Sequence, residues 1–201
     1  MQSKILFKWL FIIFGGAAVI FLVKIFPFSS VASVNPVLSS VNPVTQALPS
    51  IRVGLPTRLV IPEINVNALI KGVGLTSQGA MAVPVGPTNV TWFDLGPRPG
   101  EIGSAVIAGH EGWKDGIWAV FDDLYKLRRG DKIYVENAQN TTTTFVVVNI
   151  QRYDQHGNAS NVFNSKDGKA HLNLITCEGT WNAAQQSYSN RLVIFANEEN
   201  Q

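Results

Sequence analysis

From Arg58 onward the chain is a succession of short apolar or β-branched segments, and this pattern restricts the fold more than any other feature. The segments predicted as strands are residues 59–61, 68–71, 81–83, 104–108, 132–135, 142–151, 172–176 and 192–196. Gly, Pro, Asn and Asp separate them, as is typical of strands joined by turns. Short helical turns are expected only at residues 118–127 and 161–166. The pattern predicts an all-β fold of about eight strands, and periodicity alone leaves a closed barrel and a sandwich as alternatives.

The N-terminal segment has the character of a membrane span. Residues 5–28 are almost entirely apolar, with Lys8 and Lys24 near the two ends. A transmembrane helix needs about 20 such residues. Lys4 and Lys8 precede the apolar run, which predicts a cytoplasmic N-terminus and an extracytoplasmic C-terminal part. A cleaved signal peptide, with a site near residues 30–32, is the alternative, but its apolar region is usually only about 7–15 residues long.

Composition divides the chain into three parts. Residues 1–28 are predicted to be one N-terminal transmembrane helix that anchors the protein in the cell membrane. Residues 29–56 are uncharged except for Arg52 and rich in Pro and Ser, which indicates an extended linker. Residues 57–198 contain the predicted strands and form the expected folded domain.

Charge and cysteine content exclude several classes of function. Without the three lysines of the N-terminal segment, 13 basic residues face 14 acidic ones, and they form no basic cluster. This near-neutral balance argues against nucleic acid as a partner. The single cysteine, Cys177, excludes a disulfide within the chain and a cysteine-rich zinc site. A lone cysteine is either a buried apolar residue or a reactive thiol.

Three residues suited to acyl transfer lie at the ends of predicted strands. His110 follows the segment 104–108, Cys177 follows the segment 172–176, and Arg191 precedes the last segment. A thiolate can attack a peptide carbonyl and form a thioester. A histidine can protonate the departing amine, and an arginine can stabilise the developing oxyanion. Strand ends are places where a rigid sheet can hold such side chains together.

The sequence around these residues resembles the sortase family. Residues 172–177 read Leu-Asn-Leu-Ile-Thr-Cys, which is similar to the sortase signature T-L-x-T-C, and Arg191 follows Cys177 by 14 residues, as in sortases. The strand that ends in Ala-Gly-His110 also resembles its sortase counterpart. Further similarities occur at Trp92-Phe93, Pro99-Gly100, residues 121–124 and residues 130–133. The resemblance covers residues 57–196.

This resemblance implies a membrane-anchored cysteine transpeptidase with a sortase-like closed β-barrel. The implied catalytic residues are Cys177, His110 and Arg191, and Thr176 and Ile175 are expected to contact the substrate. The implied substrates are surface proteins with a C-terminal sorting motif of the L-P-x-T-G kind, cut between Thr and Gly through a thioester. The implied acceptor is an amine of a cell-wall precursor or a pilin. No cofactor or metal is expected, although calcium is left open because some sortases use it.

Two other interpretations compete with this one. In L,D-transpeptidases the arginine lies two residues after the cysteine, where this chain has Gly179, so that family is rejected. A catalytically inactive sortase-like binding module on the cell surface is the alternative function, and labelling of the thiol would distinguish it. The sortase class is left open, because residues 111–114 and 178–181 resemble only some sortases. His171 has no motif around it and is expected to face solvent.

Overall fold

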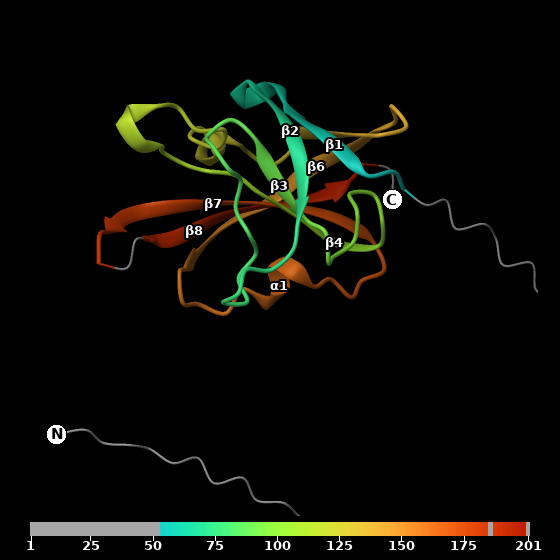
Figure 1. Ribbon diagram of the computed structural model, residues 1–201. Helices are drawn as coiled ribbons and strands as arrows, with labels where there is room; N and C mark the ends of the chain where they lie inside the picture. The colour runs from blue at the N-terminus through green and yellow to red at the C-terminus, as the bar shows by residue number, and fades with distance from the viewer. Residues whose placement is uncertain (1–52, 185–186, 200–201) are drawn as a thin grey trace, which may run out of the picture. The chain divides into compact units, whose positions relative to one another are not determined.

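Eight strands close into a barrel in the computed structural model, which describes residues 53–184 and 187–199 (Figure 1). The strands are β1 (Pro56–Ile61), β2 (Val66–Val73), β3 (Val90–Phe93), β4 (Gly103–Ala108), β5 (Lys132–Asn137), β6 (Thr142–Asp154), β7 (Ala170–Asn182) and β8 (Ser187–Glu198). Their order around the barrel is β1-β2-β3-β4-β7-β8-β6-β5, and β5 pairs with β1. The predicted all-β fold is therefore confirmed, and the barrel is chosen over the sandwich.

The connections are short and contain little helix. Three single-turn 3₁₀ helices, η1 (Pro62–Ile64), η2 (Lys114–Gly116) and η3 (Leu124–Lys126), and one α-helical turn, α1 (Ser160–Phe163), are described. The predicted helical turns at residues 118–127 and 161–166 thus correspond to η3 and α1. None of the described helices is long and apolar enough to cross a membrane.

Two pairs of neighbouring strands are parallel, and one of them determines where the predicted catalytic residues lie. β2 pairs with β3 and β4 pairs with β7 in the parallel sense, whereas the other neighbours are antiparallel. Because β4 and β7 run in the same direction, their C-terminal ends lie at the same edge of the sheet. β7 and β8 form a long hairpin that reaches to the left of Figure 1.

Hydrophobic side chains cover both faces of β4, β7 and β8. Ile107, Leu174 and Ile194 are fully buried inside the barrel. Val106 and Val193 are buried on the outer face, in a second cluster with residues of α1. Strands covered on both faces read as continuous apolar runs rather than alternating ones, which explains their clear signal in the sequence.

One predicted strand is absent from the structure, and one observed strand was not predicted. Residues 81–83 form no strand: Met81 makes one isolated bridge with Leu75, and Pro84 ends the segment because proline has no N–H for a ladder. β3 was missed, although it pairs with both β2 and β4. Its residues are β-branched or aromatic and suit a strand, and the neighbouring strands pair with it on both sides.

The N-terminal predictions are largely outside the described residues. The whole of the predicted anchor, residues 1–28, lies outside them. The same holds for the predicted linker except for residues 53–56, of which Pro56 begins β1.

Candidate active site

Cys177 and Arg191 lie directly opposite each other on β7 and β8. Opposed residues of an antiparallel pair present their side chains on the same face, with Cβ atoms about 4.5–5.5 Å apart. Alternation along β7 buries Thr176 in the barrel and leaves Cys177 half-buried on the outer face, together with Ile175. The register of this hairpin therefore brings thiol and guanidinium side by side.

His110 reaches the same place from β4. Ala108, the last residue of β4, pairs with Ile175 in the parallel register, so His110, two residues beyond Ala108, lies near the part of β7 that carries Cys177. The N–H of Gly109 donates to the Ile175 carbonyl at 3.1 Å, and the Thr176 hydroxyl donates to the Gly109 carbonyl at 2.9 Å. These two bonds fix the end of β4 against β7, and with it the start of the His110 side chain.

The residue before His110 has to be glycine for steric reasons. A Cβ atom at position 109 would lie 2.5 Å from Cδ2 of Phe121 and 2.8 Å from Cγ1 of Val120. Phe121 is 1% exposed and cannot move aside easily. The close approach of residues 109 and 121 packs the segment after His110 against the barrel.

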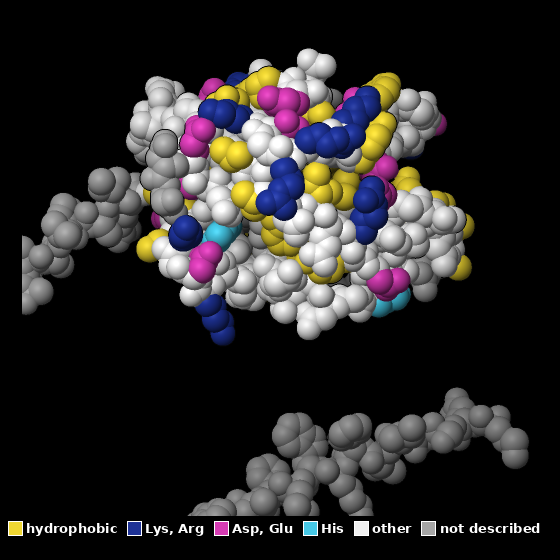
Figure 2. All heavy atoms as spheres, turned by 180° about the vertical axis from the view of Figure 1, so that it is seen from behind, with side chains coloured by type: hydrophobic (Ala, Val, Ile, Leu, Met, Phe, Trp, Pro, Cys, Tyr) yellow, Lys and Arg dark blue, Asp and Glu magenta, His cyan; other side chains and the backbone are white. Residues whose placement is uncertain are grey.

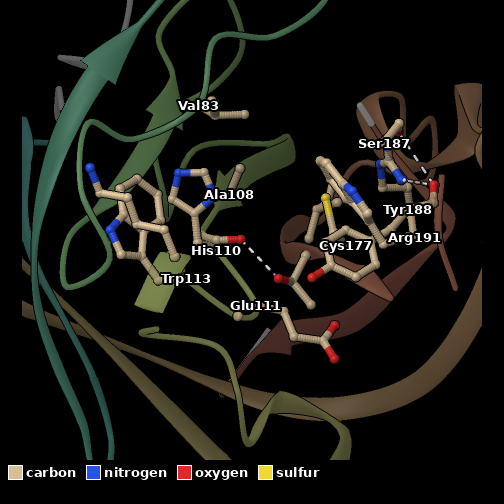
Figure 3. Close-up of a pocket in the computed structure, with 15 residues that line it drawn as sticks. Val83, Ala108, His110, Glu111, Trp113, Cys177, Ser187, Tyr188 and Arg191 are labelled. Carbon is tan, nitrogen blue, oxygen red and sulfur yellow. Dashed lines mark hydrogen bonds between the residues drawn. The ribbon is translucent and has the colours of Figure 1, made fainter. Parts of the chain in front are cut away.

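A cavity of about 770 Å³ lies between these elements (Figure 3). Cys177, His110 and Arg191 all line it, and so do Ile175 and Thr176. Its other walls include Val83, Glu111, Trp113, Lys114, Trp181, Ser187 and Tyr188. A volume of this size lies in the range of small-molecule and peptide sites, about 300–1,000 Å³.

The three residues are together but not hydrogen-bonded to one another in the part of the chain that the structure describes. His110 Nε2 lies 2.9 Å from the Pro84 carbonyl, and its ring packs against Trp113 with centroids 4.8 Å apart. Arg191 donates from Nη1 to the carbonyls of Tyr188 and Asn190, both at 2.9 Å, and from Nη2 to Ser187 Oγ at 3.0 Å. Catalytic hydrogen bonds are often absent in a protein without substrate and form in the complex.

The environment of Cys177 favours the protonated thiol. Burial raises the pKa of Cys177, and the negative charge of Glu111 adds to the rise, whereas the Arg191 charge opposes it. Since only the thiolate is nucleophilic, a proton acceptor is needed when substrate is attacked. His110, at the adjacent strand end, is the described residue placed to take that proton.

Glu111 has an unusual environment for a carboxylate. Its Oε2 is buried and has no hydrogen-bond partner among the described residues. Burial, first, and then the charges of Glu178 and Asp122 raise the pKa of Glu111 from 4.5 to about 7. A carboxyl group that titrates near neutrality in a cavity is a candidate functional group.

We expect Glu111→Gln to stabilise the protein at pH 8 but not at pH 5. The folded protein retains the Glu111 proton up to about pH 7, whereas the unfolded chain loses it near pH 4.5. Stability is therefore lost as the pH rises through that window, and glutamine, which does not ionise, avoids the loss. After discounting for partial solvent exposure, the gain at pH 8 is about 1 kcal/mol.

Thermal unfolding followed by circular dichroism at the two pH values measures this difference. Glu63→Gln, at an exposed carboxylate of η1, is the control and should show no pH-dependent gain. Equal melting temperatures of Glu111→Gln and wild type at pH 8 would contradict the buried, unpaired carboxylate.

Cys177, His110 and Arg191 were identified from the sequence, whereas several other residues that line the cavity were not. Thr176, expected to contact substrate, is 2% exposed and its hydroxyl is engaged by Gly109. Glu111 was not recognised, although a glutamate directly after the strand-end histidine was a usable signal. Trp181 and Tyr188 were also missed; they face each other across β7 and β8, with ring centroids 5.1 Å apart.

Comparisons with known proteins agree on one family. The family model for the sortase domain matches residues 59–199. Sortase A from Corynebacterium diphtheriae, as a lid mutant, has a similar structure, with TM-score 0.56 and 22% identity over 73% of this chain and 71% of that chain. Sortase C-1 from Actinomyces oris gives TM-score 0.54 and 23% identity over 72% and 74%.

A third solved structure, the sortase D5 transpeptidase of Clostridium perfringens, gives TM-score 0.54 and 21% identity over 73% of this chain and 79% of that chain. At these identities the structures establish the fold, and the family model establishes the family. No curated protein matches the sequence.

Proposed function

The chain belongs to the sortase family of cysteine transpeptidases, and on this premise we propose that it cleaves a C-terminal sorting motif of the L-P-x-T-G kind between Thr and Gly. Cys177 is the nucleophile, and the cleaved protein is held on it as a thioester. An amine of a cell-wall precursor or a pilin then takes the acyl group. The observation that carries this proposal is the convergence of Cys177, His110 and Arg191 on one cavity.

Each of these side chains has one task in the proposed reaction. His110 takes the thiol proton as Cys177 attacks and returns it to the departing amine. Arg191, which faces Cys177 across the hairpin, donates hydrogen bonds to the oxyanion of the tetrahedral intermediate. For this, His110 has to give up its contact with the Pro84 carbonyl.

Ile175 and Thr176 support the site in different ways. Ile175 is partly exposed in the cavity on the same face as Cys177, and we assign it a contact with an apolar side chain of the sorting motif. The Thr176 hydroxyl faces the Gly109 carbonyl, so its task is to position the strand that carries His110.

The N-terminal sequence supports a location at the cell membrane. We propose that residues 1–28 anchor the protein in the cell membrane, with a cytoplasmic N-terminus and the barrel outside. The face in Figure 2 has Lys and Arg side chains interspersed with acidic and hydrophobic ones, which agrees with a protein substrate rather than nucleic acid. Carbonate extraction of membranes tests the anchor: the full chain should remain in the pellet, and release of a protein beginning near Ser33 would show cleavage instead.

The proposed chemistry needs no cofactor, because the chain itself supplies the nucleophile, the proton carrier and the cation. Calcium dependence is a separate question. Rates of thioester formation in EDTA and in millimolar calcium decide it: equal rates would exclude a calcium requirement, and a calcium-dependent rate would show one without changing the proposed roles of Cys177, His110 and Arg191.

Mass spectrometry of the full-length protein with a library of sorting peptides tests the function. We expect an adduct on Cys177 with the mass of the peptide N-terminal to the cut, and its transfer to an added amine. A protein whose thiol reacts with alkylating reagents but forms no adduct with any peptide would favour the inactive binding module.

A further inference from the structure

The second half of the proposed reaction, in which an amine attacks the thioester, requires a proton acceptor that thioester formation does not require. A primary amine is mostly an ammonium ion at neutral pH, since amine pKa values lie at about 8–10.4. An ammonium ion has no lone pair and cannot attack a thioester. The site therefore needs a group close to Cys177 that binds the cation and removes one proton.

Glu111 is in the right place for this. Among the described residues that line the cavity, it carries the only carboxylate, and Lys114, Arg191 and His110 are the other ionisable groups apart from Cys177 and Tyr188. The charge of Glu111 acts on Cys177 directly, since it raises the pKa of the thiol. In Figure 3 the Glu111 side chain lies below Cys177 and its carboxylate points downward, so it has to turn to face the thioester.

Glu111 is also free to bind a ligand, unlike the acidic residues near it. Glu178 forms a two-point ion pair with Arg152, at 2.6 and 2.9 Å. Asp122 accepts hydrogen bonds from the N–H groups of Gly112 and Ala119, at 2.6 and 3.0 Å. The buried Oε2 of Glu111 has no partner among the described residues. A buried carboxylate oxygen without a donor is costly, and a bound ammonium ion would supply the donor.

We propose that Glu111 is the acceptor-amine residue of this enzyme: its carboxylate binds the ammonium group of the incoming primary amine and takes the first proton from it beside the Cys177 thioester. The inference rests on the proposed function and deepens it. It gives a role to Glu111, the cavity carboxylate that takes no part in the proposed formation of the thioester.

Attack of the amine on the thioester involves two proton transfers. The acceptor enters as R–NH₃⁺ and leaves as an amide, so its nitrogen loses two protons. Glu111 takes the first, and the nitrogen lone pair forms the C–N bond at the thioester carbonyl. As the adduct collapses, the C–S bond breaks and the second proton passes through His110 to the Cys177 sulfur. Glu111 then releases its proton to solvent.

The charged groups that face Glu111 set the pH at which it works. Glu178 and Asp122 raise its pKa, together with burial, to about 7, so that the carboxylate form dominates just above neutrality. Lys114 and Arg191 line the same cavity and Cys177 is within electrostatic reach. Amide formation should therefore increase as the pH rises through about 7, because that is where Glu111 becomes able to accept a proton.

The test compares full-length wild type, Glu111→Gln and Glu178→Gln, with a sorting peptide as donor and glycylglycine as acceptor. Thioester formation without acceptor is measured first, and the ratio of amide to hydrolysed product second. Glu111→Gln should still form the thioester, whereas its amide-to-hydrolysis ratio at pH 7.5, which does not depend on the rate of thioester formation, falls by roughly 100-fold. In Glu111→Gln, amide formation should no longer increase as the pH rises through about 7.

Two controls separate the role from a structural defect. Glu178→Gln should keep the wild-type ratio at pH 8 and move the rise to lower pH, since Glu178 raises the pKa of Glu111. Hydroxylamine, which is mostly unprotonated at pH 7.5, should be used almost equally by wild type and Glu111→Gln. Equal amide-to-hydrolysis ratios for glycylglycine in these two proteins would overturn the inference alone. A wild type that forms no thioester would overturn the proposed function and this inference with it.

Discussion

Cys177→Ala should show no measurable transpeptidation while its barrel folds like that of the wild type. The chain has no other cysteine, so no second thiol can form the thioester. Loss of a covalent nucleophile typically lowers the rate by at least about 10⁴-fold. The fold should tolerate the change, because Cys177 is half-buried on the outer face of β7 and alanine keeps its Cβ.

The measurement is amide product from a sorting peptide and glycylglycine, with the melting temperature as the folding control. Cys177→Ser is the matched variant: it keeps the size of the side chain but replaces the thiol by a hydroxyl of much higher pKa, so it should be as inactive as alanine. Turnover retained in folded Cys177→Ala would remove Cys177 from the reaction.

The sequence was most informative about the fold where strands are buried on both faces. Residues 104–108, 172–176 and 192–196 lie in β4, β7 and β8, whose interior and exterior are both covered, so their apolar runs were continuous. β3 could not be found in this way, because its four residues form a strand only between β2 and β4. The segment 81–83 looked like a strand but leads to Pro84, whose carbonyl contacts His110.

The arrangement of the site was harder to predict from the sequence, because strand register determines which residues lie close together. His110, Cys177 and Arg191 were expected at strand ends, but only His110 follows the end of its strand, whereas Cys177 and Arg191 lie within β7 and β8. Their meeting depends on the parallel β4–β7 pair and the β7–β8 hairpin. Glu111 has no described partner for Oε2, whereas its acidic neighbours are bound: Glu178 by Arg152, and Asp122 by two backbone N–H groups. His171 was expected to face solvent, but it is half-buried between Asn197 and Asp167, with bonds of 2.8 and 2.9 Å.

The contacts of Arg191 indicate what its side chain contributes. Three hydrogen bonds from Nη1 and Nη2 attach the guanidinium to the β8 strand, at Ser187, Tyr188 and Asn190. They hold the charge beside Cys177 and leave other N–H groups of the guanidinium for an oxyanion. An arginine held in this way is a preorganised donor, which stabilises a transition state without further ordering.

Arg191→Lys should therefore lower the rate at which a sorting peptide acylates Cys177 by about 100- to 1000-fold, nearly as much as Arg191→Ala. Lysine keeps the positive charge, but its ammonium group is a point charge without the planar fork of donors. It cannot keep the contacts with Ser187 and Tyr188 and also donate to the oxyanion. The substitution thus separates the geometry of the cation from its charge.

Single-turnover acylation, followed by mass spectrometry, measures this rate in wild type, Arg191→Lys and Arg191→Ala. Arg58→Lys is the matched control: Arg58 is on β1, which lies across the barrel from β7, and it contacts Asn67 and Glu136 at the surface. The control should acylate like the wild type. If Arg191 only stabilises the hairpin, the two Arg191 variants will melt earlier but acylate at the wild-type rate while folded, and that result would exclude Arg191 from catalysis.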